Sequence, residues 1–405
     1  MTPGVGSPQA EPRPRTRRHW PIRFSSPPGA LRQYLEVLAM LVLRDRVRIE
    51  ASSKCQLRCP ICPTATGVNR HGSVGWGNLS IDALRQFVDA HPGIRKIELS
   101  NWGEIFLNPE LKEIIEYAHQ MGVKLTGDNG VNFNVVNDEV LEALVRHKFT
   151  SLTISIDGAS NETYQVYRKG GDLDRVIGNI ERLNTFKEKY GSRLPRLIWQ
   201  FVIFGHNEHE LPLARALAKQ LGMSFRSKLS ADHWDRSYAP VRDADFVRTQ
   251  SGLGVASREE FRERYGRDYK LPCQQLWLSP QINWDGKLLG CCENIWGDYG
   301  NVFESGLNSC IRSERYVYTK KMLLGQAEPR SDLPCFNCSF YRNRSLLRFF
   351  NANRAKRLLR FVFQAHVLRG NTALDSIVDI ARSAQLSKDL VRFVRELPVA
   401  LIHAA

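Results

Sequence analysis

The cysteines Cys55, Cys59 and Cys62 lie on one short segment with the spacing Cys-x3-Cys-x2-Cys, directly after an apolar run. Protein thiolates are the usual ligands of a [4Fe–4S] cluster. Three thiolates on one loop would hold three irons and leave the fourth iron open to a small molecule. A zinc site more often takes four ligands as two close pairs, and no histidine stands within this motif. The spacing therefore favours a reactive iron–sulfur cluster over zinc or plain buried thiols.

A second group consists of Cys273, Cys291 and the Cys-x2-Cys pair Cys335 and Cys338. The Asp-Gly pair at 285–286, between apolar runs, predicts a β-hairpin just before Cys291. Four cysteines in this arrangement could enclose one further metal centre. Taken alone, the group suits a structural zinc ion at least as well as a second cluster.

Cys292 and Cys310 are left over from these two groups. Adjacent cysteines do not easily serve the same centre, so we expect Cys292 to be a bystander of Cys291. Either thiol could donate a hydrogen atom to a radical, but a small buried side chain is the more ordinary role of a free cysteine.

The composition is that of an ordinary globular protein, with 405 residues, 42% hydrophobic and 24% charged. No stretch of eighteen apolar residues exists, and the arginines of 13–18 precede no signal-peptide core. Without an export signal, clustered cysteines favour metal ligation in a reducing compartment over disulfides. We therefore expect a cytoplasmic protein.

The net charge of +15 is concentrated at the two ends of the chain. Residues 1–50 carry +5 and residues 341–405 carry +8, which leaves +2 for the middle of the chain. A nucleic-acid enzyme would more often place its basic stripe near the active site. The basic termini could contact a membrane surface or an acidic partner, although most such tails are simply solvated.

Apolar, β-branched runs alternate with helix-period segments from residue 46 onward. The expected strands are 47–51, 96–100, 123–127, 151–157, 197–204 and 224–229. The expected helices are 81–90, 109–121, 138–147, 173–190 and 209–221, with Ser80 capping the first. Six βα units in series predict a parallel sheet with helices outside it, either doubly wound or an open barrel.

The sequence divides into five expected regions. They are a basic, partly disordered N-terminal extension at 1–45, a barrel at 46–230, an irregular linker or cap at 231–270, an auxiliary metal domain at 271–340 and a basic helical extension at 341–405. An amphipathic helix is expected near 31–45 and another at 345–368. The sequence motifs considered below fall at the carboxyl ends of the expected strands, which is where barrel enzymes place their chemistry.

The first cysteine motif, following the first strand, resembles that of the radical S-adenosylmethionine (SAM) enzymes. The resemblance implies a partial (β/α)6 TIM-like barrel. It also implies a [4Fe–4S] cluster whose open iron chelates the methionine part of SAM, and a flavodoxin- or ferredoxin-type reductant.

Other loops carry parts of the same resemblance. Gly103 and Glu104 match two positions of a Gly-Gly-Glu-Pro element that meets the SAM amino group, although Trp102 and Ile105 depart from it. Ser155 and Arg168 resemble a Ser-x-Asp-Gly…Tyr…Arg stretch whose serine and arginine are candidates for the SAM carboxylate, since guanidinium pairs bidentately with carboxylate. Without the resemblance, Arg168 would be an exposed helix arginine and Glu104 the start of a surface loop.

The second cysteine group is similar to the SPASM/Twitch extension of the same enzymes. The resemblance covers Cys273, the Gly286-x4-Cys291 hairpin and the final Cys335-x2-Cys338. No cysteine follows Cys338, so the shorter Twitch form with one auxiliary [4Fe–4S] cluster fits better than a full SPASM domain.

This resemblance implies reductive cleavage of SAM to a 5′-deoxyadenosyl radical that abstracts a hydrogen atom from the substrate. Oxidation or epimerisation of a small-molecule or carbohydrate-like substrate is favoured. The peptide-modifying members of the family often carry an N-terminal domain that binds the leader peptide, and only about 46 residues precede the barrel here. A peptide maturase is the alternative within the family. An iron–sulfur electron carrier or a zinc-stapled structural protein is the alternative from another class. No general base stands out, although His206, His209 and His233 lie near expected strand ends or the cap.

Overall fold

The computed structural model describes residues 45–230, 238–266, 269–270, 272–323 and 325–342. The expected helix at 345–368 and all but the last residue of the one at 31–45 lie outside these ranges, as does His233. Among the described residues, no helix is both long enough and apolar enough to cross a membrane.

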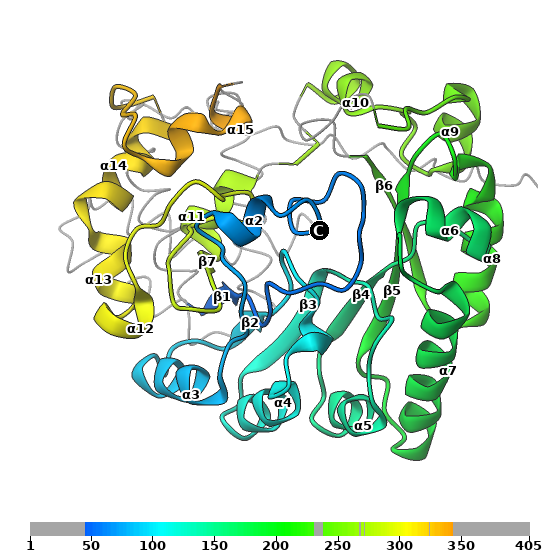
Figure 1. The fold of residues 1–405 in the computed structure, drawn as a ribbon, viewed down its shortest axis with the longest axis horizontal. Helices are drawn as coiled ribbons and strands as arrows, with labels where there is room; N and C mark the ends of the chain where they lie inside the picture. The colour runs from blue at the N-terminus through cyan, green and yellow to red at the C-terminus, as the bar shows by residue number, and fades with distance from the viewer. Residues whose placement is uncertain (1–44, 231–237, 267–268, 271, 324, 343–405) are drawn as a thin grey trace, which may run out of the picture.

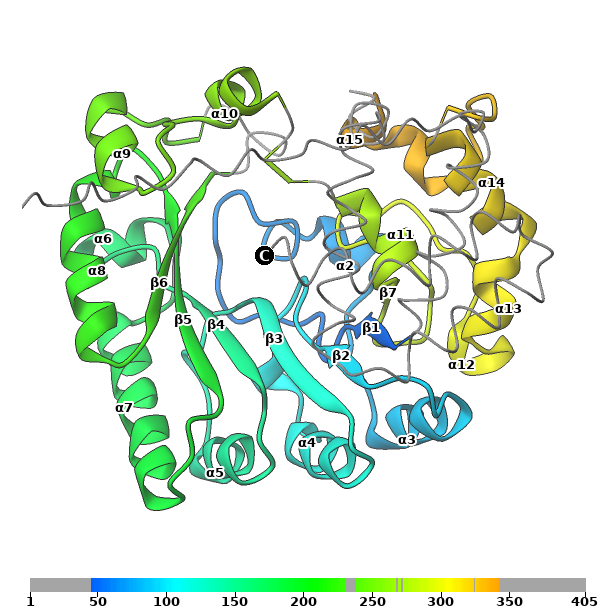
Figure 2. The same cartoon turned by 180° about the vertical axis from the view of Figure 1, so that it is seen from behind.

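A curved sheet of seven parallel strands forms the centre of the fold, in the order β6-β5-β4-β3-β2-β1-β7 (Figures 1 and 2). The six expected strands are all present, and the partial-barrel prediction is confirmed. The strands are β1 (Arg46–Ile49), β2 (Lys96–Glu98), β3 (Lys124–Val131), β4 (Ser151–Ser155), β5 (Arg196–Ile203), β6 (Ser224–Leu229) and β7 (Gln281–Ile282).

Amphipathic helices cover the outer side of this sheet (Figure 1). They are α3 (Ile81–Ala90), α4 (Leu111–Gln120), α5 (Asp138–Arg146), α7 (Leu173–Lys189) and α8 (Leu211–Gln220). Ser80 caps α3 as expected, because its hydroxyl accepts the N–H of Ala83 at 3.2 Å. The side chains of strand β5 alternate between the helix-covered outer side of the sheet and its inner side. Its residues Trp199, Phe201 and Ile203 are fully buried, whereas the alternating Gln200 and Val202 line a cavity on the inner side.

The structure differs from the expected elements in three places. Strand β3 was expected to end at residue 127 but continues to Val131. Its pairing with β4 shifts in register between Gly127 and Val131, so the stretch Asp128-Asn129-Gly130 belongs to the strand although its composition is that of a loop. A short helix α6 (Asn161–Tyr167) follows β4. The region 231–270, expected to be irregular, contains α9 (Ala244–Gln250) and α10 (Arg258–Tyr265), each capped by the side chain that precedes it.

Several further elements complete the described chain. They are α2 (Val68–His71), η1 (Ile105–Leu107), η2 (Glu208–Glu210), η3 (Pro272–Gln274), α11 (Gln275–Leu278), α12 (Val302–Ser305), α13 (Leu307–Arg312), α14 (Glu314–Leu323), η4 (Pro334–Asn337) and α15 (Ser339–Arg342).

The predicted hairpin is present at Asp285-Gly286, where Asn283 and Lys287 are joined by an N–H···O bond of 2.9 Å. Gly286 has φ 88°, and a Cβ there would lie 2.2 Å from the Asn301 side chain, so only glycine fits this turn. The strand that leads into the hairpin, β7, pairs in parallel with β1. The buried residues of this C-terminal region therefore belong to the same hydrophobic core as the barrel.

Candidate active site at the carboxyl ends of the strands

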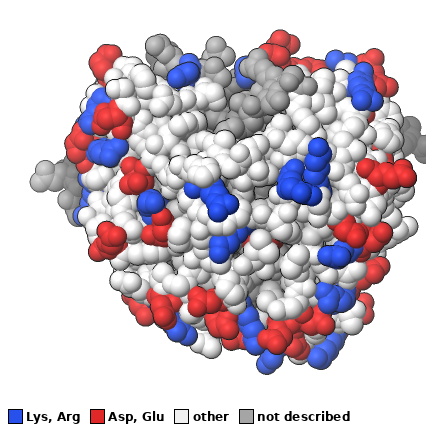
Figure 3. Space-filling model, in the orientation of Figure 1, with Lys and Arg blue, Asp and Glu red and all other residues white. Residues whose placement is uncertain are grey.

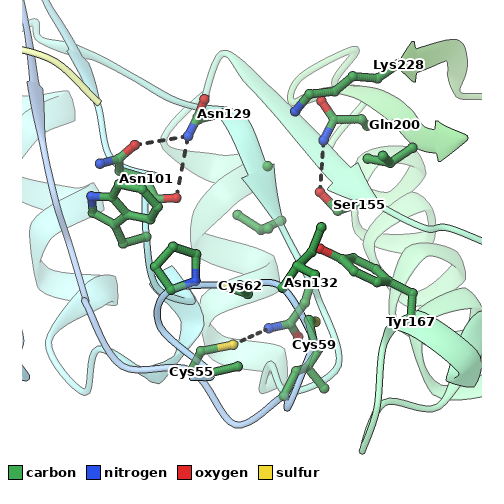
Figure 4. Close-up of a pocket in the computed structure, with 18 of the residues that line it drawn as sticks. Cys55, Cys59, Cys62, Asn101, Asn129, Asn132, Ser155, Tyr167, Gln200 and Lys228 are labelled. Atoms are coloured by element: carbon green, nitrogen blue, oxygen red, sulfur yellow. Dashed lines mark hydrogen bonds between the residues drawn. The ribbon is translucent and has the colours of Figure 1, made fainter. Parts of the chain in front are cut away.

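The three cysteines of the first motif line one cavity of about 230 Å³ at the carboxyl ends of the strands (Figure 4). The Cys62 N–H donates to the Cys59 carbonyl at 3.2 Å, which closes the tight Cys-x2-Cys turn. The Arg58 N–H donates to the Lys169 carbonyl at 2.8 Å and fixes the loop to the end of α6. The sequence motif therefore folds into one loop whose thiols share a single space.

Polar groups in the same cavity act on these thiols. Burial raises the pKa of Cys55 to about 12 and that of Cys59 to about 11. The Arg168 guanidinium opposes this rise by lowering the pKa of Cys59. The Asn132 amide lies 3.6 Å from the Cys55 sulfur, where it can donate a hydrogen bond. Both contacts favour thiolates, which is the form that metal ligation needs.

A buried carboxylate holds the loop that carries Gly103. Glu50, directly after β1, accepts the N–H of Trp102 on both oxygens and the N–H of Gly103, each at 3.0 Å. A Cβ at Gly103 would lie 2.1 Å from the Ser52 carbonyl oxygen. The backbone of this loop thus packs directly against the backbone of the segment that leads into the cysteines. Glu50 was not among the residues that the sequence predicted for the site.

Glu104 lines the cavity, but its carboxylate is already engaged by its own chain. It accepts the backbone N–H groups of Phe106 and Asn132 and is only 1% exposed. Burial raises the pKa of Glu104 to about 7, although these N–H bonds and Arg168 lower it. The expectation of a surface-loop acid is wrong, because the side chain is buried at the cavity wall.

Arg168 is not an exposed helix arginine. Its guanidinium contacts the fully buried carboxylate of Asp157 at 2.7 Å and lies over the ring of Tyr167, 5.3 Å from its centroid. Ser155, at the end of β4, accepts the amide of Gln200 at 3.2 Å. Ser155 and Arg168 both line the cavity, together with Gly103 and Glu104. All four candidate SAM-contact residues are thus brought together with the first cysteine triad.

Glu98, at the end of β2, is a second anchoring carboxylate that sequence reasoning missed. It accepts both the N–H and hydroxyl of Ser100, and the N–H groups of Asp128 and Asn129. Asn129 in turn donates to the Asn101 side chain at 3.1 Å (Figure 4). Glu50 and Glu98 each follow an isoleucine at the end of an apolar strand, in the pairs Ile49-Glu50 and Ile97-Glu98. This pattern in the sequence could have indicated both anchoring carboxylates.

The candidate histidines His206 and His209 do not join this cavity. His206 stacks on Phe204 with ring centroids 5.4 Å apart, and His209 is exposed. Neither of them lines the cavity. The Asn207 side chain donates to the carbonyls of Asp157 and Val202, and these bonds hold the loop after β5 against the end of β4.

The second cysteine group is buried in the C-terminal region. Cys273 lies in η3, Cys291 follows the hairpin, Cys335 lies in η4 and Cys338 directly follows it. Each of the four is between 5% and 7% exposed. The Cys338 N–H donates to the Cys335 carbonyl at 3.2 Å, the same turn as in the first motif. The Tyr299 hydroxyl lies 3.4 Å from the Cys335 sulfur.

The two leftover cysteines differ from one another. Cys310 is buried in α13 with its sulfur 3.2 Å from the Ser305 hydroxyl, as expected of a small packing residue. Cys292 instead lines the main cavity. Its backbone N–H donates to Gln275 at 2.7 Å, and its carbonyl accepts from Asn101 at 3.4 Å. Since consecutive Cα atoms are about 3.8 Å apart, Cys291 lies directly behind the cavity wall.

The residues present fit thiolate-ligated clusters. The first triad gives three sulfurs on one loop, with Arg168 and Asn132 as cationic and amide donors. The second group gives four buried thiols, and burial raises the pKa of each. Charge on other cysteines of the group adds to the rise for Cys273, Cys291 and Cys335. Within the described ranges, no three His, Cys, Asp or Glu side chains converge closely enough to hold a single metal ion. A cluster differs from such a site because its ligands bind different irons.

Comparison with known proteins places this geometry in a family. Residues 49–210 match the family model described as the Radical SAM superfamily, so this part of the chain is a radical SAM domain. A curated relative, the AdoMet-dependent heme synthase of Methanosarcina barkeri, is 28% identical over 188 residues, which cover 46% of this chain and 50% of that protein. The chain spans roughly half the length of several curated relatives that it matches.

Two solved structures share the fold at low identity. SuiB of Streptococcus suis bound to S-adenosylmethionine has a TM-score of 0.51 at 13% identity, over 76% of this chain and 74% of that one. Native anSMEcpe with bound AdoMet has a TM-score of 0.50 at 13% identity, over 80% of this chain and 97% of that one. These likenesses show that the overall fold is shared.

Proposed function

We propose that this member of the radical SAM superfamily cleaves SAM reductively and uses the resulting 5′-deoxyadenosyl radical to abstract a hydrogen atom from a small-molecule substrate. The observation that carries the proposal is that the thiols of one loop share one cavity with Gly103, Glu104, Ser155 and Arg168. A [4Fe–4S] cluster bound there would supply the open iron and the electron for SAM cleavage. An electron carrier needs no such cavity.

The residues of the chain would bind and orient SAM. Arg168 is positioned beside Cys59, and its guanidinium offers N–H groups beyond those bonded to Asp157, so it could pair with a carboxylate. The Ser155 hydroxyl faces the same space and can donate a second hydrogen bond. Gly103 lets the backbone approach a ligand without a side chain in between. Buried walls around these groups would exclude water from the radical.

Cys273, Cys291, Cys335 and Cys338 would hold one auxiliary [4Fe–4S] cluster. Cys292 lines the cavity, so its neighbour Cys291 lies within one residue of the substrate space. An electron acceptor at that distance would suit a net two-electron oxidation of the substrate.

Anaerobic reconstitution with iron and sulfide, followed by iron counting and SAM cleavage with dithionite, tests this proposal. We expect about eight irons per chain and release of 5′-deoxyadenosine. Cys59→Ala should abolish cleavage and keep about four irons, whereas Cys335→Ala should lose only the auxiliary cluster. Cys310→Ala is the matched control and should behave as wild type.

Failure of the reconstituted protein to release 5′-deoxyadenosine would refute the assignment. Zinc retained by the second cysteine group would remove the electron-acceptor role and leave redox-neutral chemistry such as epimerisation.

A further inference from the structure

Three polar side chains form a row across the inner side of the sheet. Ser155 on β4 is paired in register with Gln200 on β5, and Gln200 is paired with Arg226 on β6. Residues that are paired in register on neighbouring strands point to the same face of a sheet. Ser155 and Gln200 both line the cavity and are 5% exposed, whereas Arg226 is exposed and does not line it. Arg226 therefore reaches the cavity only through Gln200.

Hydrogen bonds along this row fix the direction of each group. A guanidinium can only donate, so the Arg226 bond of 3.1 Å must end on the side-chain oxygen of Gln200. The amide NH2 of Gln200 then faces Ser155 and donates to its hydroxyl oxygen at 3.2 Å (Figure 4). The Ser155 hydroxyl carries a single proton, and no group in the described part of the chain accepts it. This proton is therefore available to a ligand in the cavity.

The neighbouring strand leaves the Ser155 hydroxyl open to the cavity. Gly130, near the end of β3, also lines the cavity, and a Cβ there would lie 2.6 Å from the Ser155 oxygen and 3.4 Å from the Gln200 amide nitrogen. Glycine keeps this approach free of a side chain. Arg168, held by Asp157, lines the same cavity. Two donors therefore serve one space, which suits a carboxylate because a carboxylate only accepts hydrogen bonds.

We propose that Gln200 and Arg226 are positioning residues that hold the Ser155 hydroxyl as a hydrogen-bond donor to the carboxylate of SAM. The inference rests on the proposed function, since it takes SAM as the ligand of the cavity. Without Arg226, the Gln200 amide can turn over and present its oxygen to Ser155, whose proton is then used within the chain. Hydrogen bonds in such a series also polarise one another, so each bond strengthens the next.

SAM binding to the reconstituted protein tests the inference without a reductant, because no turnover is needed. Equilibrium dialysis with labelled SAM under anaerobic conditions gives the Kd of each variant. Ser155→Ala should weaken SAM binding about tenfold or more, because a hydrogen bond to a charged group is lost. Arg226→Met and Gln200→Met should each weaken it about threefold or more, since the hydroxyl loses its orientation. Arg226→Lys keeps a donor for Gln200 and should bind SAM as wild type.

Double variants separate positioning from a structural or purely electrostatic role. In the Ser155→Ala background, neither Arg226→Met nor Gln200→Met should weaken SAM binding further, because both act through the hydroxyl. Arg196→Met, at the exposed opposite end of β5, is the matched control and should bind SAM as wild type. Unchanged SAM affinity in Arg226→Met, or losses that persist in the Ser155→Ala background, would overturn the inference alone. No binding of SAM by the wild-type protein would instead refute the proposed function, and the inference with it.

Discussion

Gly103→Ala is the substitution that most directly tests how the site is built. An alanine Cβ there would lie 2.1 Å from the Ser52 carbonyl oxygen and 2.7 Å from that of Lys54. Ordinary contact begins at 3.4 Å, so the backbone would have to part by about 1.3 Å. The atoms involved belong to main chain rather than flexible side chains, so the strain cannot be relieved locally.

Other bonds prevent the two segments from separating. The Glu104 N–H donates to the Lys54 carbonyl at 2.7 Å, and Thr64 donates to the Trp102 carbonyl at 2.9 Å. Overpacking a dense interior costs about 1–3 kcal/mol, and we expect Gly103→Ala to reach at least the upper end. That corresponds to a fall in Tm of about 6–12 °C for a domain of this size. The cysteine loop should lose its cluster.

Thermal unfolding and iron content after reconstitution measure this outcome. Gly178→Ala is the matched control, because Gly178 lies within α7 with nothing within 4 Å of the added Cβ. It should stabilise the protein by about 0.5–1 kcal/mol. The second cysteine group should keep about four irons in Gly103→Ala, which separates a local loss from global unfolding. Wild-type Tm, iron content and SAM cleavage in Gly103→Ala would refute the close packing of these two segments.

Three other predictions follow from the site. Burial raises the pKa of Glu50 from 4.5 to about 7, although the N–H bonds from Gly103 and Trp102 lower it. The folded state therefore holds this proton more tightly, and the resulting stability, about 3 kcal/mol, is present below pH 4.5 and lost as the pH rises through 7. Glu50→Gln should flatten the decline of Tm over that interval, and an unchanged pH profile would contradict the raised pKa. Arg168→Met strands the buried Asp157 carboxylate and should cost about 3–5 kcal/mol. Adding Asp157→Asn should recover most of the Tm but not the affinity for SAM, whereas wild-type SAM affinity in the single variant would remove Arg168 from the SAM site. Cys292→Ala should keep about eight irons and wild-type 5′-deoxyadenosine release without substrate, because four other thiols complete the second group; loss of about four irons would make Cys292 a ligand.

Figure 3 shows how charged side chains are distributed over one face of the molecule. Acidic and basic side chains are interspersed around the edge of the face in Figure 3, and the middle of this face is largely uncharged apart from a few basic groups. This mixture agrees with the charge along the sequence, which is nearly neutral in the middle of the chain.

Local information in the sequence predicted most of the fold. The 81–90 helix and the 224–229 strand have the observed bounds, and the other strands and helices predicted between residues 46 and 230 differ at their ends by a few residues. Periodicity and capping act between near neighbours in the chain, so the sequence alone carries them. The extended end of β3 was missed because Asp128-Asn129-Gly130 has the composition of a turn.

The cysteine spacing, likewise local, determined the candidate cluster loop and its partner group. Only the tertiary structure decided what surrounds them. Glu50 and Glu98 accept hydrogen bonds from loops that lie about thirty to fifty residues away in the sequence. Cys292 lines the cavity, and β7 pairs in parallel with β1 although more than 230 residues separate them. Ser155, Gln200 and Arg226 meet because sheet register brings distant segments together. Spacing along the chain contains no record of such contacts, since they arise only when the segments share one core.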